Sequence, residues 1–304
     1  MKVDFGFITR ESFRIAWRHK LLWIYGIFVS GTAWNTNLGG DADSMGLDSF
    51  EGSLSQLPDI PEAFWVGAGI AIAIFVIAMF LAGVVSTGAL TDAVNRIVRG
   101  NGRWGFGQSL SRALDFFWPL LGMFFTVVLG TAAYLIIAVL IGVGAFAIHI
   151  AAGILYILVA IPLSAIVFWA GLTTYSLAQR ALIIRGLDYG GAWTEGWALF
   201  QRFWKESAIM ALLRIGIGIA IAMATAMIML IFGGPAFLTA IAGGLELTLS
   251  IILAMLIAWP VLLIVGGFAG TVTFNLYTLF YFELVEPRRQ RMAPDQTPPP
   301  GPSA

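Results

Sequence analysis

The chain has 304 residues, of which 59% are hydrophobic and 11% charged, and its formal net charge is zero. This composition, with a mean hydropathy of +0.87, excludes an ordinary soluble protein and is typical of an integral membrane protein. The sequence contains no cysteine, which excludes disulfides, thiolate nucleophiles and cysteine metal sites.

Six apolar segments, taken in chain order, are candidates for membrane-spanning helices. A helix needs about 20 apolar residues to cross the hydrocarbon core of a bilayer. Five segments reach or approach that length: 63–85, 119–141, 150–178, 215–232 and 247–282. We expect a helix end at Gly233-Gly234-Pro235 and a break at Pro260, because proline lacks the N–H that a helix needs. The first segment, 21–34, has only about 14 apolar residues and is shorter than a usual span.

The positions of the basic residues decide whether this short segment crosses the membrane. All 17 Lys and Arg fall into four clusters: 2–20, 96–112, 180–214 and 288–291. The connections between them contain none: 31–62, 142–150 and 233–246. Under the positive-inside rule all four clusters are cytoplasmic, so an even number of crossings separates the first from the second. Segment 21–34 must therefore cross as well, and its cleavage as an export signal is disfavoured because an odd number of spans would remain.

Three stretches of the sequence align as an internal repeat: "FGFITRESFRIAWRHK" from Phe5, "FGQSLSRALDFFWPLL" from Phe106 and "AWTEGWALFQRFWKES" from Ala192. In each stretch an apolar residue precedes a tryptophan by four positions, which is one helical face. The tryptophans are Trp17, Trp118 and Trp204. Amphipathic helices of this kind lie at the bilayer interface, so these tryptophans are expected to be interfacial anchors.

The predicted fold is therefore an all-α polytopic membrane protein with six transmembrane helices. They are arranged as three repeats of an interfacial amphipathic helix plus two spans, at about 5–100, 105–187 and 190–285. The repeats form a single transmembrane domain, 1–285, followed by a disordered Pro-rich cytoplasmic tail, 286–304. We expect it in the cell inner (plasma) membrane, with both termini cytoplasmic.

Polar residues at the cytoplasmic ends of the second span of each repeat are the candidate site, because ionisable groups in membranes are costly and often functional. They are Asp92, Asn95, Arg96, Gln179, Arg180, Asn275 and Glu283. Asp92 and Arg96 lie four apart and are expected to pair on one helix face. Together these residues either line a polar vestibule open to the cytoplasm or bind lipid headgroups as anchors, and we favour anchoring.

Other polar and small residues are expected to be structural. His149 stands alone in an apolar connection, and Gly266 and Gly270 have the spacing of closely packed membrane helices. No hydrolase, zinc-protease or phosphate-loop motif is present in the sequence, and the acidic stretch from Asp41 matches an EF-hand loop only in part. We therefore expect no catalytic residue, no cofactor, no metal and no nucleic-acid partner. The expected partners are membrane lipid and a protein in the membrane.

The sequence contains "SFRIAWRHKLLWIYGIF", then "GFGQSLSRALDFFW" after a pair of spans, then "GGAWTEGWALFQRFW" after another pair, and this pattern resembles a known group. The group comprises uncharacterised bacterial polytopic membrane proteins related to the glycerophosphoryl diester phosphodiesterase membrane-domain family. The likeness covers most of the chain and implies a bacterial inner-membrane protein in lipid or envelope metabolism. The family's catalytic domain is not part of this sequence, so no catalytic residue is carried over.

Two functions remain open at this stage. The first is a non-enzymatic integral membrane protein that binds lipid or a partner protein. The alternative is a transporter of a small or lipid-like solute through a polar path between the repeats. The two differ in whether Asp92, Arg96, Arg180 and Asn275 converge inward or project outward.

Overall fold

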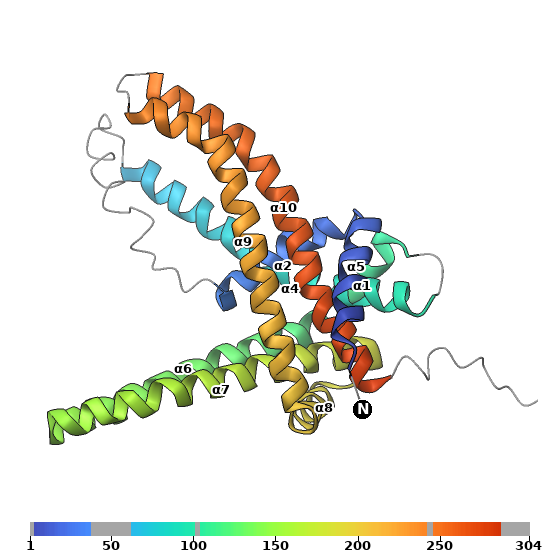
Figure 1. Cartoon of the computed structure of the whole chain (residues 1–304), viewed down its shortest axis with the longest axis vertical. Helices are drawn as coiled ribbons and strands as arrows, with labels where there is room; N and C mark the ends of the chain where they lie inside the picture. Colours follow the sequence, from blue (N-terminus) through green and yellow to red (C-terminus); the bar gives the residue numbers. More distant parts are fainter. Residues whose placement is uncertain (1–2, 38–61, 101–103, 242–245, 287–304) are drawn as a thin grey trace, which may run out of the picture. The chain divides into compact units, whose positions relative to one another are not determined.

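The computed structural model describes residues 3–37, 62–100, 104–241 and 246–286, and these described residues form nine α-helices and no strand (Figure 1). The helices are α1 (Phe5–Arg18), α2 (Leu22–Asn37), α4 (Glu62–Val98), α5 (Phe106–Asp115), α6 (Phe117–Ile148), α7 (Ile150–Arg185), α8 (Tyr189–Arg202), α9 (Trp204–Ile241) and α10 (Glu246–Val285). The all-helical prediction is therefore confirmed for the described part of the chain. The acidic stretch from Asp41 and almost all of the predicted tail lie outside it.

Five helices, α4, α6, α7, α9 and α10, are each long and apolar enough to cross a membrane within the described residues. The most apolar windows of α6 and α7 have a mean hydropathy of 2.5, and 0% and 6% of their residues are buried. Large apolar side chains thus point away from the protein, which is what contact with lipid requires. The five helices are compatible with a multi-pass membrane protein. At 16 residues, or about 24 Å at 1.5 Å per residue, α2 is shorter than these five helices and is not one of them.

The long helices do not break where proline predicts a break. Helix α9 continues through Gly233-Gly234-Pro235 to Ile241, and α10 continues through Pro260, so both predicted interruptions are wrong. A proline removes one backbone hydrogen bond, whereas ending a helix inside a membrane would expose several polar backbone groups to hydrocarbon. Continuing the helix is the less costly outcome.

The predicted connection at 142–150 is reduced to one residue. Helix α6 ends at Ile148 and α7 begins at Ile150, so His149 alone joins them. Its Nδ1 accepts a hydrogen bond of 3.1 Å from the backbone N–H of Ala151, which would otherwise lack a partner at the start of α7. His149 therefore has a structural role, as expected.

A shorter helix precedes a longer one three times: α1 before α2, α5 before α6 and α8 before α9. The breaks fall at residues 19–21, at Phe116 and at Phe203. Each short helix buries one face, which includes Ser12 on α1, Ala113 on α5 and Phe200 on α8. Near each break lies one of the predicted anchors, Trp17, Trp118 and Trp204, with exposed fractions of 67%, 76% and 53%.

The chain divides into two compact units, which do not follow the predicted repeat boundaries. The first unit contains residues 1–15, 118–220 and 275–304, and the second contains 16–117 and 221–274. The centre of the first unit is the C-terminal end of α10, where Leu276, Phe280 and Phe282 are fully buried. The ring of Phe280 stacks on Phe5 of α1 with the centroids 6.4 Å apart.

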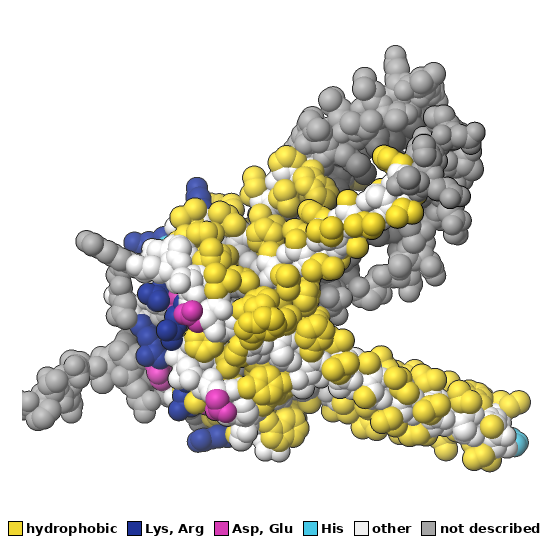
Figure 2. All heavy atoms as spheres, turned by 180° about the vertical axis from the view of Figure 1, so that it is seen from behind, with side chains coloured by type: hydrophobic (Ala, Val, Ile, Leu, Met, Phe, Trp, Pro, Cys, Tyr) yellow, Lys and Arg dark blue, Asp and Glu magenta, His cyan; other side chains and the backbone are white. Residues whose placement is uncertain are grey.

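Helices α6 and α7, both in the first unit, run side by side as a hairpin (Figure 1). The hydroxyls of Tyr134 and Ser164 hydrogen-bond across it at 2.8 Å. Figure 2 shows hydrophobic side chains, in yellow, along the arm that this hairpin forms at the lower right. The hairpin is therefore held together by a few polar bonds and close contacts, while its outer surface is apolar.

In the second unit, α2 packs closely on α10 through small residues. A Cβ atom on Gly26 would overlap the carbonyl oxygen of Gly267 and the hydroxyl of Thr271. The hydroxyl of Thr271 also lies 3.1 Å from the carbonyl oxygen of Leu22. The expected packing role of glycine on α10 thus falls on Gly267, one position away from Gly266, where an added Cβ would meet nothing within 4 Å.

Candidate functional site

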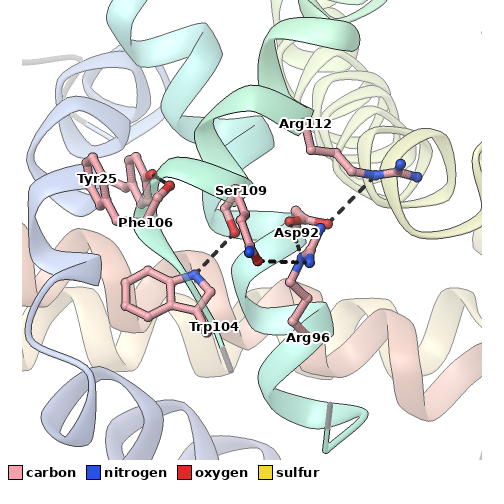
Figure 3. A network of polar contacts seen from close by, with 8 residues as sticks. Tyr25, Asp92, Arg96, Trp104, Phe106, Ser109 and Arg112 are labelled. Atoms are coloured by element: carbon pink, nitrogen blue, oxygen red, sulfur yellow. Dashed lines mark hydrogen bonds and ion pairs between the residues drawn. The ribbon is translucent and has the colours of Figure 1, made fainter. Parts of the chain in front are cut away.

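The second unit contains a buried carboxylate, Asp92 of α4, between two arginines (Figure 3). The Nε of Arg96 donates a hydrogen bond of 2.7 Å to Asp92 Oδ2. The Nε of Arg112, from α5, lies 3.8 Å from Oδ1. Arg96 also reaches Gln108 of α5, with Nη1 3.5 Å from Oε1. We call these four residues the Asp92 cluster, and within it the predicted pairing of Asp92 with Arg96 is confirmed.

Aromatic and hydroxyl side chains fix the start of α5 beside this cluster. Tyr25 of α2 donates a hydrogen bond of 2.8 Å to the carbonyl oxygen of Phe106, and the two rings stack in parallel at 4.6 Å (Figure 3). The indole N–H of Trp104 donates to the hydroxyl of Ser109 at 3.2 Å. Because α5 is held at both points, Gln108 and Arg112, four residues apart on one face, are directed toward α4.

The electrostatics of the Asp92 cluster leave it with positive charge in excess. One carboxylate lies between two guanidinium groups, and the side chain of Asp92 is 4% exposed. Two charge-assisted contacts offset the cost of burying that carboxylate. The side chains of Arg96 and Arg112 remain 34% and 47% exposed. Their remaining N–H donors are therefore accessible at the surface of this unit.

The first unit contains a second polar group of residues, Arg180, Arg214, Tyr277 and Thr278, which we call the Arg180 cluster. Arg180 of α7 is 2% exposed, and its Nε donates to the Thr278 hydroxyl of α10 at 3.3 Å. The guanidinium carbons of Arg180 and of Arg214, from α9, lie 5.6 and 5.4 Å from the ring centroid of Tyr277. Two cation–π contacts and a hydrogen bond thus join three long helices at one point.

Asn275 lies one turn before Thr278 on the same face of α10. It is fully buried, and neither its Oδ1 nor its Nδ2 has a hydrogen-bond partner among the described residues. The hydroxyls of Thr174 on α7 and Ser207 on α9 are also buried without a hydrogen-bond partner among the described residues. A buried polar group without a partner costs about 1–3 kcal/mol, so such groups favour occupation by water or by a polar ligand.

A third polar contact joins α7, α8 and α10 in the first unit. Arg185 Nη1 donates to Glu195 Oε2 at 2.6 Å, and the Tyr281 hydroxyl donates to Glu195 Oε1 at 2.7 Å. Both partners of Glu195 are distant in the sequence, at 10 and 86 residues. Neither contact was predicted, because no periodicity within one helix indicates which residues of another helix it will meet.

The predicted site residues are mostly buried. Asp92, Gln179, Arg180, Asn275 and Glu283 are each at most 7% exposed, and Asn95 buries its side-chain oxygen without a partner among the described residues. Of the four residues that separate anchoring from transport, Asp92 and Arg96 belong to the second unit, and Arg180 and Asn275 to the first. Only Arg96 among these four is substantially exposed in its unit.

The fold and these polar clusters define a class, an all-helical protein with long apolar helices compatible with repeated membrane crossing. Comparison of the chain with protein-family models, with curated proteins and with solved structures gives no match. Within the described residues, no group of three His, Asp or Glu side chains is placed to hold a metal ion. The polar clusters are therefore the features of the molecule that bear on its function.

Proposed function

We propose that this chain is a non-enzymatic integral membrane protein that binds the headgroup of an anionic lipid at the Asp92 cluster. The observation that carries the proposal is that one buried carboxylate orients two arginines, from α4 and α5, which stay 34% and 47% exposed. Arginine presents a fork of N–H donors that fits a phosphate, and an excess positive charge favours an anionic lipid over a zwitterionic one.

The membrane arrangement proposed with this function has six spans, with α2 as the sixth, and both termini in the cytoplasm. Close packing of Gly26 on Gly267 supports a span for α2, because small residues at helix contacts are characteristic of membrane helices. In each of the three sets a shorter helix is followed by two longer ones, which supports three repeats. The resemblance to the glycerophosphoryl diester phosphodiesterase membrane-domain family supports a bacterial inner-membrane location and a link to lipid metabolism.

Lipid titration followed by native mass spectrometry tests the headgroup site. Full-length protein in mild detergent is titrated with phosphatidylglycerol and, separately, with phosphatidylcholine. We expect Arg112→Gln to weaken phosphatidylglycerol binding about tenfold, because it removes one charged donor set, and to leave phosphatidylcholine binding unchanged.

The matched control is Arg202→Gln. Arg202 and Arg112 are both exposed and both lie over a phenylalanine ring at a helix break, at 5.2 Å from Phe203 and 5.5 Å from Phe116. We expect no change in affinity for this control. An equal loss in both variants would mean that general surface charge attracts the lipid, and it would contradict a site at the Asp92 cluster.

Transport is a second candidate, which the buried and unpartnered amide of Asn275 favours. Because the chain is free of cysteine, Asn275→Cys introduces a single thiol. A path with alternating access predicts that a membrane-impermeant thiol reagent reacts with it from both sides of the membrane. Reaction from neither side would assign Asn275 to a closed polar core and remove the observation that supports transport.

A further inference from the structure

The first unit contains an open groove of about 210 Å³ between α6 and α7, bordered by α8. Val127, Gly130 and Tyr134 of α6, Gly171 of α7 and Trp193 of α8 line it. The hollow exists because two glycines face it: a Cβ atom added to Gly130 or to Gly171 would meet no atom within 4 Å. Any larger residue at either position would occupy this space.

The position of the groove indicates what surrounds it. Both of its walls belong to helices whose most apolar windows are 0% and 6% buried, so lipid would surround most of this hairpin in a membrane. The α6 wall of the groove, from Val127 to Tyr134, extends about 10 Å at 1.5 Å per residue. The lining is mainly apolar. A hydrocarbon chain matches the length of this wall and the apolar lining.

Trp193 of α8 borders one side of the groove. One turn earlier on α8, the hydroxyl of Tyr189 hydrogen-bonds to that of Thr126, which lies one turn before Gly130. The Arg185–Glu195 ion pair joins the C-terminal end of α7 to the middle of α8. A chain in the groove would therefore have its headgroup end at α8, where Trp commonly meets the carbonyl region of a bilayer.

We propose that this groove holds one acyl chain of a glycerophospholipid, with the headgroup end of that chain at α8. The site is separate from the headgroup site at the Asp92 cluster, since its lining residues belong to the first unit and the Asp92 cluster to the second. Failure of either proposal leaves the other intact, because Arg112→Gln changes one site and a glycine substitution changes the other.

Photo-crosslinking tests the acyl-chain site. Full-length protein is reconstituted in vesicles of phosphatidylcholine and phosphatidylglycerol that contain some phosphatidylcholine with a diazirine midway along one chain. After illumination, mass spectrometry locates the labelled peptides. We expect labelling at residues 127–134 and 167–172 to exceed that of the rest of the hairpin, and Gly171→Leu or Gly130→Leu to reduce it about fivefold.

The control is Gly144→Leu. Gly144 lies on the same helix as Gly130, and an added Cβ there also meets nothing within 4 Å, but it does not line the groove. It should leave the labelling unchanged. Uniform labelling along the wild-type hairpin, or unchanged labelling in Gly171→Leu, would overturn the proposal. A groove occupied by a helix of a partner or a second copy would exclude the labelled lipid from the wild-type protein, which would overturn it too.

Discussion

The two ends of α7 differ in a way that reverses the pattern of soluble proteins. In its first half, Ile154, Leu158 and Ile161 are 60%, 70% and 65% exposed. In its second half, Thr173 and Arg180 are each 2% exposed. Helix α10 repeats the contrast, with Trp259 65% exposed and Asn275 fully buried. We call these the apolar ends and the basic ends of the long helices.

This contrast shows which interactions specify the fold. Lipid tails are as apolar as leucine, so burying the apolar ends against one another gains little. What distinguishes one arrangement from another is close contact at small residues and polar bonding between helices. The basic ends contain the Asp92 cluster, the Arg180 cluster and the contact between Glu195 and Tyr281. Substitutions at these contacts should therefore matter more than substitutions of exposed apolar residues.

The largest expected effect on stability comes from a substitution that breaks a close contact between helices. Gly26→Leu places a side chain into the backbone of α10 at Gly267, so α2 can no longer lie against it. We expect the free energy of unfolding in detergent to fall by about 3 kcal/mol or more, with loss of folded protein on size-exclusion chromatography. Gly69→Leu on α4 is the control, since an added Cβ there meets nothing within 4 Å. Equal effects of the two would mean that α2 does not pack as described.

The second effect removes the charge at the centre of the Asp92 cluster. Asp92→Asn keeps the shape of the side chain but loses its attraction for Arg96 and Arg112. We expect unfolding in detergent to become easier by about 2 kcal/mol. Asp115→Asn, at an exposed position on α5, should change the stability by less than about 0.5 kcal/mol. A stable Asp92→Asn variant would show that the ion pairs do not contribute to the fold.

The third effect compares hydrogen bonds at the two kinds of end. Tyr281→Phe removes a bond to the carboxylate of Glu195, and Tyr134→Phe removes a bond to the hydroxyl of Ser164 in the hairpin. We expect costs of about 1.5 kcal/mol for Tyr281→Phe and about 0.6 kcal/mol for Tyr134→Phe, because only the first bond is charge-assisted. Chemical unfolding of the two variants measures both values. A larger cost for Tyr134→Phe than for Tyr281→Phe would contradict the idea that contacts at the basic ends stabilise the fold more than contacts at the apolar ends.

The smallest effect concerns pH. Burial, together with the neighbouring charge of Arg18, lowers the pKa of His19. The unfolded chain therefore binds a proton more readily than the folded one, and the stability that neutral His19 contributes is lost as the pH falls below about 6.5. Thermal unfolding between pH 7.5 and 5.5 should show a smaller loss of stability in His19→Gln than in the wild type. Identical pH profiles would assign that loss to other groups.

The sequence predicts the positions of the helices better than it predicts the contacts between them. The five long apolar helices and the pair of Asp92 with Arg96 follow from length and from a spacing of four along one helix. Arg112 was missed as a partner of Asp92, and Arg214 as a neighbour of Tyr277, because each contact joins two different helices and no spacing along one helix predicts it. The continuation of α10 through Pro260 depends on the surrounding membrane, which no local propensity describes.

In the proposed membrane arrangement, α2 crosses the membrane and the basic ends face the cytoplasm. Single cysteines in this cysteine-free chain test it directly, with an impermeant thiol reagent added outside intact cells. Ser44→Cys should react at once, whereas Ser111→Cys on α5 and Thr194→Cys on α8, both exposed in the folded protein, should react only after the membrane is permeabilised. Reaction of Ser111→Cys and Thr194→Cys in intact cells, with Ser44→Cys protected, would contradict the account.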